Sequence, residues 1–399
     1  MEQNPASQHA RNTYAGRGGL ATCFFVAAQT QNFSYLLIMK MKTVIRIVVG
    51  LLVVCIFILI TISCTNDKFL TSSDEIEFPK QLTSSGKDFI SYYSPNGEYI
   101  AFLSTRNTYN PNVAEIIFEL WLMKSDGSNQ HPIILTNDLH EKWITVNNVS
   151  WFNDSNNMLA QIRTPKGNEI WRVTLDGNKT KLSSTDDCAE QPKYSPDGLK
   201  IAFLIQGPNP PQGSPVYKLY ISNIDFSEPV LVDKGLIQNF EWKSDSNELI
   251  YSLYDRPNEN YELWKYSISK MAKLQFSNTS VSEEHSSYSS DGKYIAYSVQ
   301  NTVYVTPSDT FRPKKVLDNA RMPKWMPKQN FLLIVSEQTL DNKSFWTESW
   351  IVNIEGNVVK KIAKGKPITV NFSSDGKYFV YSVDGNLWVD QLFKLDSNY

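Results

Sequence analysis

The feature that most constrains this chain is a hairpin motif that recurs seven times. Its clearest copy is Tyr288–Ser298, where YSSDGKYIAYS has the pattern of a strand end, an Asp-Gly turn and a second strand. Related segments begin at the aromatic residues Tyr93, Trp151, Tyr194, Trp242, Trp325 and Phe372. They recur every 37 to 58 residues, which is typical of repeated β-units of about four strands.

A second count of the chain gives the same number. Downstream of each hairpin lies a short predicted strand with an aromatic residue at its centre: Trp121, Trp171, Tyr220, Trp264, Tyr304, Trp350 and Trp388. A fourth strand follows in the first six units, but only Asp390–Tyr399 remains after the seventh. Pro79–Thr83 precedes the first hairpin and has the pattern of an unpaired fourth strand. We therefore expect an all-β propeller of seven four-stranded blades, whose last blade is closed by the N-terminal strand.

The repeat resembles that of a known family. The pattern aromatic-Ser-Pro-Asp-Gly-x-x-Ile-Ala-Phe, clearest in Tyr194–Phe203, Tyr288–Tyr297 and Phe372–Tyr381, is similar to the WD-related propeller repeat of the TolB-like family. The copies at Trp151, Trp242 and Trp325 depart from it at the Asp-Gly turn. The resemblance covers about residues 76–399. It implies a propeller, with six blades as the alternative to seven because six is common in that family. It says little about function, since propellers host many activities.

The residues before the repeats have the layout of an export signal. We interpret residues 1–38 as a mis-started or disordered extension, with translation beginning at Met39 or Met41. Residues 39–64 carry a basic start, an uncharged apolar run over Ile47–Ile62, and an ending that resembles a bacterial lipobox, with Cys64 as the lipidation site. Residues 65–75 form a polar tether before the propeller at 76–399.

The alternative to lipidation is a single N-terminal transmembrane helix, because the apolar run is close to spanning length. In both cases the propeller is exported and anchored to the membrane, on its periplasmic or outer side. The formal net charge of -2 gives no electrostatic reason to expect nucleic acid as a partner. Cys188 is the one cysteine after Cys64, so the sequence predicts no disulfide in the propeller.

Catalytic patterns are scarce. The exported part contains three scattered histidines, His131, His140 and His285, which give little support for a metal site. Neither a Gly-x-Ser-x-Gly elbow nor a phosphate-binding loop occurs. The acidic pair Glu283-Glu284 falls in a polar connection, which we interpret as a solvated loop. The sequence therefore predicts a protein that is not an enzyme, with no cofactor and no metal.

The predicted recognition surface is one rim of the propeller. Four connections on the face opposite the Asp-Gly turns are expected to be long: Thr105–Phe118, Gln206–Val216, Asp255–Asn260 and Glu337–Phe345. The candidate contact residues are Tyr109, Trp143, Tyr217, Tyr254, Tyr261 and Phe345. For each of them, packing between blades is the alternative role.

These features favour a membrane-tethered module of the cell envelope that binds a protein or peptide, or acts as a scaffold. The first alternative is a carbohydrate-binding or carbohydrate-processing envelope protein, with a glycan as ligand. The second is a purely structural tether.

Overall fold

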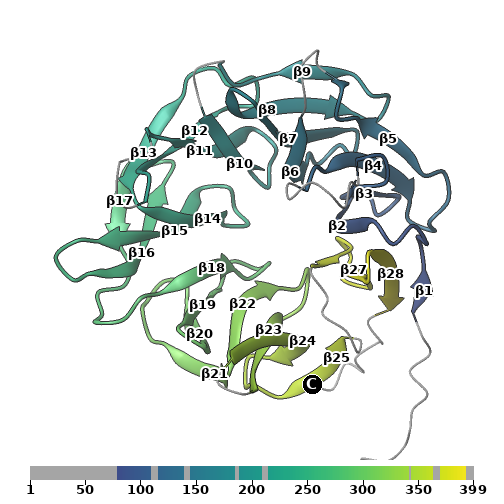
Figure 1. The fold of residues 1–399 in the computed structure, drawn as a ribbon. Coiled ribbons are helices and arrows are strands. Elements are labelled where there is room, and N and C mark those ends of the chain that lie inside the picture. Colours follow the sequence, from purple (N-terminus) through teal and green to yellow (C-terminus); the bar gives the residue numbers. More distant parts are fainter. Residues whose placement is uncertain are drawn as a thin grey trace, which may run out of the picture. The chain divides into compact units, whose positions relative to one another are not determined.

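The computed structural model describes residues 79–108, 116–138, 144–184, 188–208, 214–340, 343–362 and 369–391, and of residues 337–340 and 343–347 it describes the backbone alone. The β-strands in these ranges form seven four-stranded sheets. The sheets are arranged as the blades of a ring, with the first strand of each blade nearest the centre (Figure 1). The prediction of seven blades is confirmed, and the six-bladed alternative is wrong.

The first four blades come from continuous sequence. Blade 1 contains β2 (Asp88–Tyr93), β3 (Tyr99–Ser104), β4 (Glu119–Lys124) and β5 (His131–Ile134). Blade 2 contains β6 (Thr145–Trp151), β7 (Asn157–Thr164), β8 (Gly167–Thr174) and β9 (Lys179–Lys181). Blade 3 contains β10 (Cys188–Tyr194), β11 (Lys200–Gln206), β12 (Tyr217–Asn223) and β13 (Val230–Gly235). Blade 4 contains β14 (Ile237–Trp242), β15 (Glu248–Asp255), β16 (Asn260–Ser267) and β17 (Ala272–Gln275).

Blades 5 and 6 follow the same plan, and blade 7 joins the two ends of the described chain. Blade 5 contains β18 (Glu284–Tyr288), β19 (Tyr294–Val299), β20 (Thr302–Pro307) and β21 (Lys314–Asp318). Blade 6 contains β22 (Ala320–Trp325), β23 (Phe331–Leu340), β24 (Lys343–Asn353) and β25 (Val358–Ile362). Blade 7 contains β26 (Val370–Phe372), β27 (Tyr378–Val383), β28 (Asn386–Gln391) and β1 (Lys80–Gln81).

The closure of the ring matches the sequence prediction. The short strand β1 pairs antiparallel with β28, with Lys80 opposite Val389 and Gln81 opposite Trp388. Leu82 and Thr83 continue this contact, because both donate their backbone N–H to the carbonyl of Leu387. The open edge of the last blade is thus covered by the N-terminal strand.

The Ser-x-Asp-Gly motif folds the hairpin turn through its side chains. In blade 5, Ser289 Oγ donates to Asp291 Oδ1 at 2.7 Å, and the same carboxylate accepts the backbone N–H of Lys293 at 3.1 Å. Gly292 has a φ of 70°, which glycine adopts without steric cost. In the divergent copies at Trp151 and Trp242, Ser155 and Ser246 take the same left-handed conformation at the glycine position, so those turns keep their shape without glycine. In the copy at Trp325 the left-handed residue is Lys328, one position earlier in the turn.

The hydrophobic core is divided among the blade interfaces. Each of seven buried apolar clusters draws its residues from two neighbouring blades. The cluster between blades 7 and 1 includes Leu82 from the N-terminal segment, packed with residues such as Phe102 and Val380. Ring closure therefore completes an apolar interface as well as a sheet.

The repeat aromatics also join neighbouring blades. Three opening tryptophans donate their indole N–H to a carbonyl of the preceding blade: Trp151 to Tyr92 (3.1 Å), Trp242 to Lys193 (3.2 Å) and Trp325 to Ser287 (3.1 Å). The residue before the aromatic can reach the following blade. Ser287 Oγ, for example, donates to the carbonyl of Pro323 at 3.2 Å.

Two expected loops are shorter than predicted. Strands β15 and β16 extend to Asp255 and Asn260, so only a four-residue turn joins them. Strands β23 and β24 extend through most of Glu337–Phe345. The predicted extension, signal and tether at residues 1–38, 39–64 and 65–75 lie outside the described residues. Within the described ranges, no helix is long and apolar enough to cross a membrane.

Candidate functional site

A pocket of about 420 Å³ lies beside the ring closure. Its lining consists of the segment Gln81–Ser85, which leads from β1 toward β2, together with Arg106 and Gln130 from blade 1. The pocket exists because the N-terminal segment docks between blades 7 and 1. It therefore depends on the closed ring and not on one blade.

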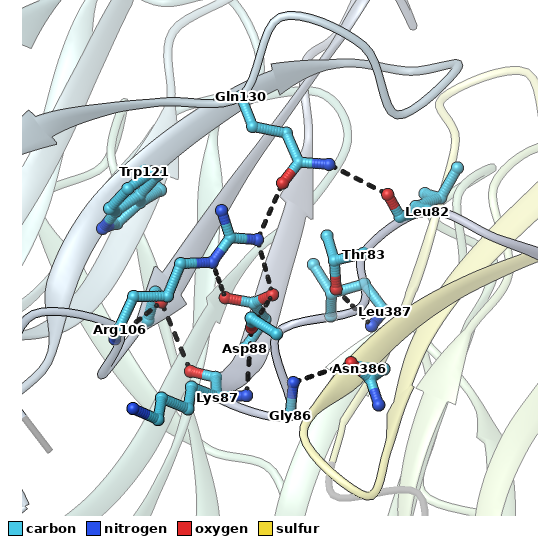
Figure 2. A network of polar contacts seen from close by, with 12 residues as sticks. Leu82, Thr83, Gly86, Lys87, Asp88, Arg106, Trp121, Gln130, Asn386 and Leu387 are labelled. Carbon is cyan, nitrogen blue, oxygen red and sulfur yellow. Dashed lines mark hydrogen bonds and ion pairs between the residues drawn. The ribbon is translucent and has the colours of Figure 1, made fainter.

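Arg106 is the charged group of this pocket, and its position is fixed by several partners (Figure 2). It binds the carboxylate of Asp88 with two N–H groups, Nε to Oδ1 at 2.9 Å and Nη2 to Oδ2 at 2.7 Å. Its guanidinium lies over the Trp121 ring, 4.8 Å from the centroid. Asp88 is fully buried, whereas the Arg106 side chain keeps 19% of its surface exposed. The pair thus presents a rigid guanidinium to the pocket.

Gln130 connects this ion pair to the N-terminal segment. Its Oε1 accepts from Arg106 Nη2 at 2.7 Å, and its Nε2 donates to the carbonyl of Leu82 at 2.9 Å. On the other side of the segment, Asn386 Oδ1 of blade 7 accepts the backbone N–H of Gly86 at 2.8 Å. Figure 2 shows these contacts on two sides of the segment, with Arg106, Gln130 and Leu82 linked on one side and Gly86 and Asn386 on the other. The network holds the pocket wall in place from both neighbouring blades.

A second polar region lines the space enclosed by the inner strands. Lys324 Nζ, on β22, donates to Asn371 Oδ1 of blade 7, and its charge also interacts with Glu241 and Lys193 of blades 4 and 3. Lys324 belongs to blade 6, and blades 3 and 4 are not its neighbours in the ring. Its side chain must therefore extend into the central space to interact with them. Water reaches this side chain, but the surrounding protein removes much of its hydration and lowers the pKa of Lys324 to about 8. Nearby on the inner strands, Asn239 Oδ1 and His285 Nδ1 are buried without a hydrogen-bond partner in the described structure.

The predicted rim residues fall into three groups. Tyr109 and Trp143 lie outside the described residues, as does the predicted lipidation site Cys64, and Phe345 lies on β24 where only the backbone is described. Tyr254 and Tyr261 face each other across β15 and β16 as an edge-to-face pair, with ring centroids 5.3 Å apart. Tyr217, at the start of β12, hydrogen-bonds Glu190, whose pKa is raised by burial. The described members are thus strand residues and do not form one cluster.

The histidines do not assemble. His131 hydrogen-bonds the carbonyl of Asn129 through Nδ1 at 2.8 Å, and His285 lies on β18 in another blade. His140 is outside the described residues. In the part of the chain that the structure describes, no three His, Cys, Asp or Glu side chains form a possible metal-binding group.

Two features were missed by the sequence analysis. Arg106 belongs to no sequence motif, because its partner Asp88 lies 18 residues earlier on β2 and the pocket wall comes from the N-terminal segment. Glu283 was interpreted as part of a solvated loop, and this was wrong, because the residue is only 1% exposed. The surrounding connection folds inward against blade 4, which a local polar pattern does not reveal.

Comparisons with known proteins show the fold. No protein-family model and no curated protein matches the chain. An oligogalacturonate lyase from Vibrio parahaemolyticus matches with a TM-score of 0.63 and 9% identity, over 81% of this chain and 95% of that one. Hydrazine synthase from Kuenenia stuttgartiensis matches with a TM-score of 0.54 and 13% identity, over 78% and 97%.

A putative TolB from Agrobacterium tumefaciens also matches, with 16% identity over 66% of this chain and 94% of that one, at a TM-score of 0.45. At these identities the likenesses concern the fold alone. The activity of each neighbour therefore belongs to that neighbour.

Proposed function

We propose that this chain is a non-enzymatic binding module, exported and tethered to the cell envelope, that holds a peptide segment of a partner protein in the pocket beside the ring closure. The observation that carries the proposal is the fixed guanidinium of Arg106 at the edge of that pocket. The export and the anchor rest on the signal-like residues 39–64 and on Cys64.

The hydrogen-bonding state of Arg106 supports a ligand oxygen as its partner. Its Nε and Nη2 are engaged with Asp88 and Gln130, whereas Nη1 has no such bond to a described residue. A guanidinium nitrogen with free N–H groups is a strong donor to a carbonyl or carboxylate oxygen. Since Asp88 and Trp121 already hold the side chain, a ligand would not have to order it.

The size and lining of the pocket favour a short extended segment. A volume of about 420 Å³ lies in the range of roughly 300–1,000 Å³ that is usual for small-ligand sites. The lining is rich in hydroxyl and amide groups, from Thr83, Ser84, Ser85, Gln81 and Gln130. Such groups suit the alternating donors and acceptors of a peptide backbone.

The test uses a photo-crosslinking amino acid at Ser84, which is exposed in the pocket wall, in the full-length chain in intact cells. We expect one partner protein to be captured at Ser84 but not at Ser269, an exposed serine in the turn between β16 and β17. A Ser84→Trp substitution, which places a bulky side chain in the pocket wall while both members of the Arg106–Asp88 pair are kept, should abolish partner binding, and Ser269→Trp should not.

Equal crosslinking at both positions would count against the pocket. Binding to a glycan array that Ser84→Trp removes, with no protein captured, would favour the carbohydrate alternative instead. Substrate turnover by the purified chain would overturn the non-enzymatic role.

A further inference from the structure

Two carboxyl groups meet in the interior at the interface of blades 4 and 5. Glu262 lies on β16, and Glu283 immediately precedes β18, at the end of the connection Phe276–Glu283. Glu262 is 0% exposed and Glu283 is 1% exposed. Neither belongs to the pocket at the ring closure. Two full negative charges in contact at such burial would be strongly unfavourable.

The hydrogen bonds around Ser277 indicate how this cost is avoided. Ser277 Oγ lies 2.6 Å from Glu262 Oε2 and 3.0 Å from Glu283 Oε2, and it accepts the backbone N–H of Leu263 at 2.8 Å. A serine hydroxyl has one proton to donate and two lone pairs to accept with. It can therefore donate to only one of the two carboxyl groups. The other contact is satisfied if that carboxyl carries a proton and donates it to Ser277.

The remaining partners of the pair are neutral. Thr279 donates its backbone N–H to Glu262 Oε1 at 2.9 Å and its hydroxyl to Glu283 Oε1 at 2.6 Å. Asn260 Nδ2 donates to Glu262 Oε1 at 3.1 Å. No cation contacts either carboxylate among the described residues, so one shared proton is the charge compensation that the geometry allows.

The other titratable groups around the pair do not supply a positive charge. Tyr297, on β19, faces Glu283, and its own pKa is raised by burial and by that carboxylate. On the strand that follows Glu283, Glu284 and His285 interact with each other, with Oε2 and Nδ1 3.9 Å apart. Burial, together with the neighbouring Glu262, raises the pKa of Glu283 to about 7.

A bound cation is a less suitable explanation for the cluster. The amide nitrogen of Asn260 donates to three oxygens: Glu262 Oε1, the carbonyl of Thr279 (2.9 Å) and the carbonyl of Val281 (3.1 Å). It therefore already occupies the position between these oxygens that a cation would take. A calcium ion would need these oxygens as ligands. The amide would have to leave before a metal could bind.

We propose that Glu262 and Glu283 share one proton that keeps the connection Phe276–Glu283 closed over blade 4, and that loss of this proton releases the connection. Glu262 is fixed in the middle strands of its blade, whereas Glu283 lies in the connection, so relief of the repulsion moves Glu283. Ser286 follows three residues later, and its carbonyl accepts from Asn239 of blade 4 at 3.0 Å. Release of the connection therefore also loosens the wall of the central space at blades 4 and 5.

The test is hydrogen–deuterium exchange of the Phe276–Glu283 segment in the full-length chain, at pH 6 and pH 8.5. Opening linked to release of one proton increases by up to about tenfold per pH unit above the pKa. We expect wild type to exchange at least about tenfold faster than Glu283→Gln at pH 8.5, and at an equal rate at pH 6. Comparison at the same pH cancels the intrinsic pH dependence of exchange.

Two further measurements keep the test decisive. Glu262→Gln should suppress the same transition. If either variant fails to fold, infrared spectroscopy of the wild type should show a protonated carboxyl band at pH 6 that disappears toward pH 8.5. Equal exchange of wild type and variants at pH 8.5, absence of that band, or a transition that follows calcium or EDTA instead of pH would each overturn the proposal.

Discussion

Gly376 packs directly against the backbone of Pro327, so that a Cβ atom at Gly376 would lie 2.5 Å from the Pro327 carbonyl oxygen. Gly97 has almost the same conformation, with a φ of 75° against 71°, but its Cβ position has no neighbour within 4 Å. The two glycines occupy the same turn of blades 7 and 1. They differ in whether an atom of the preceding blade lies next to the Cβ position, as the Pro327 carbonyl of blade 6 does at Gly376.

This difference predicts unequal costs for the same substitution. Gly97→Ala should lower the free energy of unfolding by about 1–2 kcal/mol, the cost of a left-handed alanine. Gly376→Ala should cost clearly more, because the backbone of Pro327 must also move. Urea denaturation of both variants measures the difference. Equal losses would mean that the turns of neighbouring blades are not packed against each other as described.

The repeats made the architecture predictable, because each blade encodes its own hairpin and third strand locally. Even the divergent copy at Trp325 forms a complete blade, although its left-handed turn residue, Lys328, stands one position before the place of glycine in the other copies. The pocket was not predictable in this way. Asp88 of the same blade fixes the Arg106 side chain, but the pocket wall beside it is the N-terminal segment, which only ring closure brings there. Glu283 is buried by a neighbouring blade, which no local pattern reports.

The Arg106–Asp88 pair should be sensitive to removal of either member. Arg106→Met leaves the fully buried Asp88 carboxylate without its cation, which typically costs about 3–5 kcal/mol. Adding Asp88→Asn to that variant should recover part of the loss, because no charge then remains buried. A double-mutant cycle by thermal or urea unfolding measures the coupling, and additive losses would contradict it. Lys315→Met, which breaks an exposed pair with Asp318, serves as the control and should have a much smaller effect.

Lys324 should give the stability a pH dependence in the alkaline range. Its pKa in the folded chain is about 8, below the ordinary value of 10.5. Between these values the unfolded chain holds a proton that the folded chain has lost, so the free energy of unfolding should rise with pH in this window. Lys324→Met should remove that rise, whereas Lys314→Met, at an exposed position on β21, should keep it. Unfolding curves from pH 7.5 to 10.5 provide the measurement, and identical profiles for wild type and Lys324→Met would contradict the placement of this side chain.

The anchor prediction rests on Cys64 and is independent of the propeller. Cys64→Ala should abolish incorporation of a labelled fatty acid and release the protein from the membrane fraction. The folded propeller should be unaffected, as judged by its melting temperature. If the variant stays in the membrane with an unchanged apparent mass, an uncleaved N-terminal helix is the anchor instead.

Thr83 tests the ring closure at a single hydrogen bond. Its Oγ1 accepts the backbone N–H of Leu387 at 2.9 Å in a buried position, where water cannot replace it. Thr83→Val keeps the shape of the side chain but leaves that N–H without an acceptor, which should cost about 1–3 kcal/mol. Amide exchange at Leu387 should accelerate together with the loss of stability, because β1 then holds β28 less firmly. Ser84→Val, at the exposed neighbouring position, should leave both quantities unchanged. Wild-type exchange at Leu387 in Thr83→Val would show that the ring is held closed by the apolar contacts of Leu82 and not by this hydrogen bond.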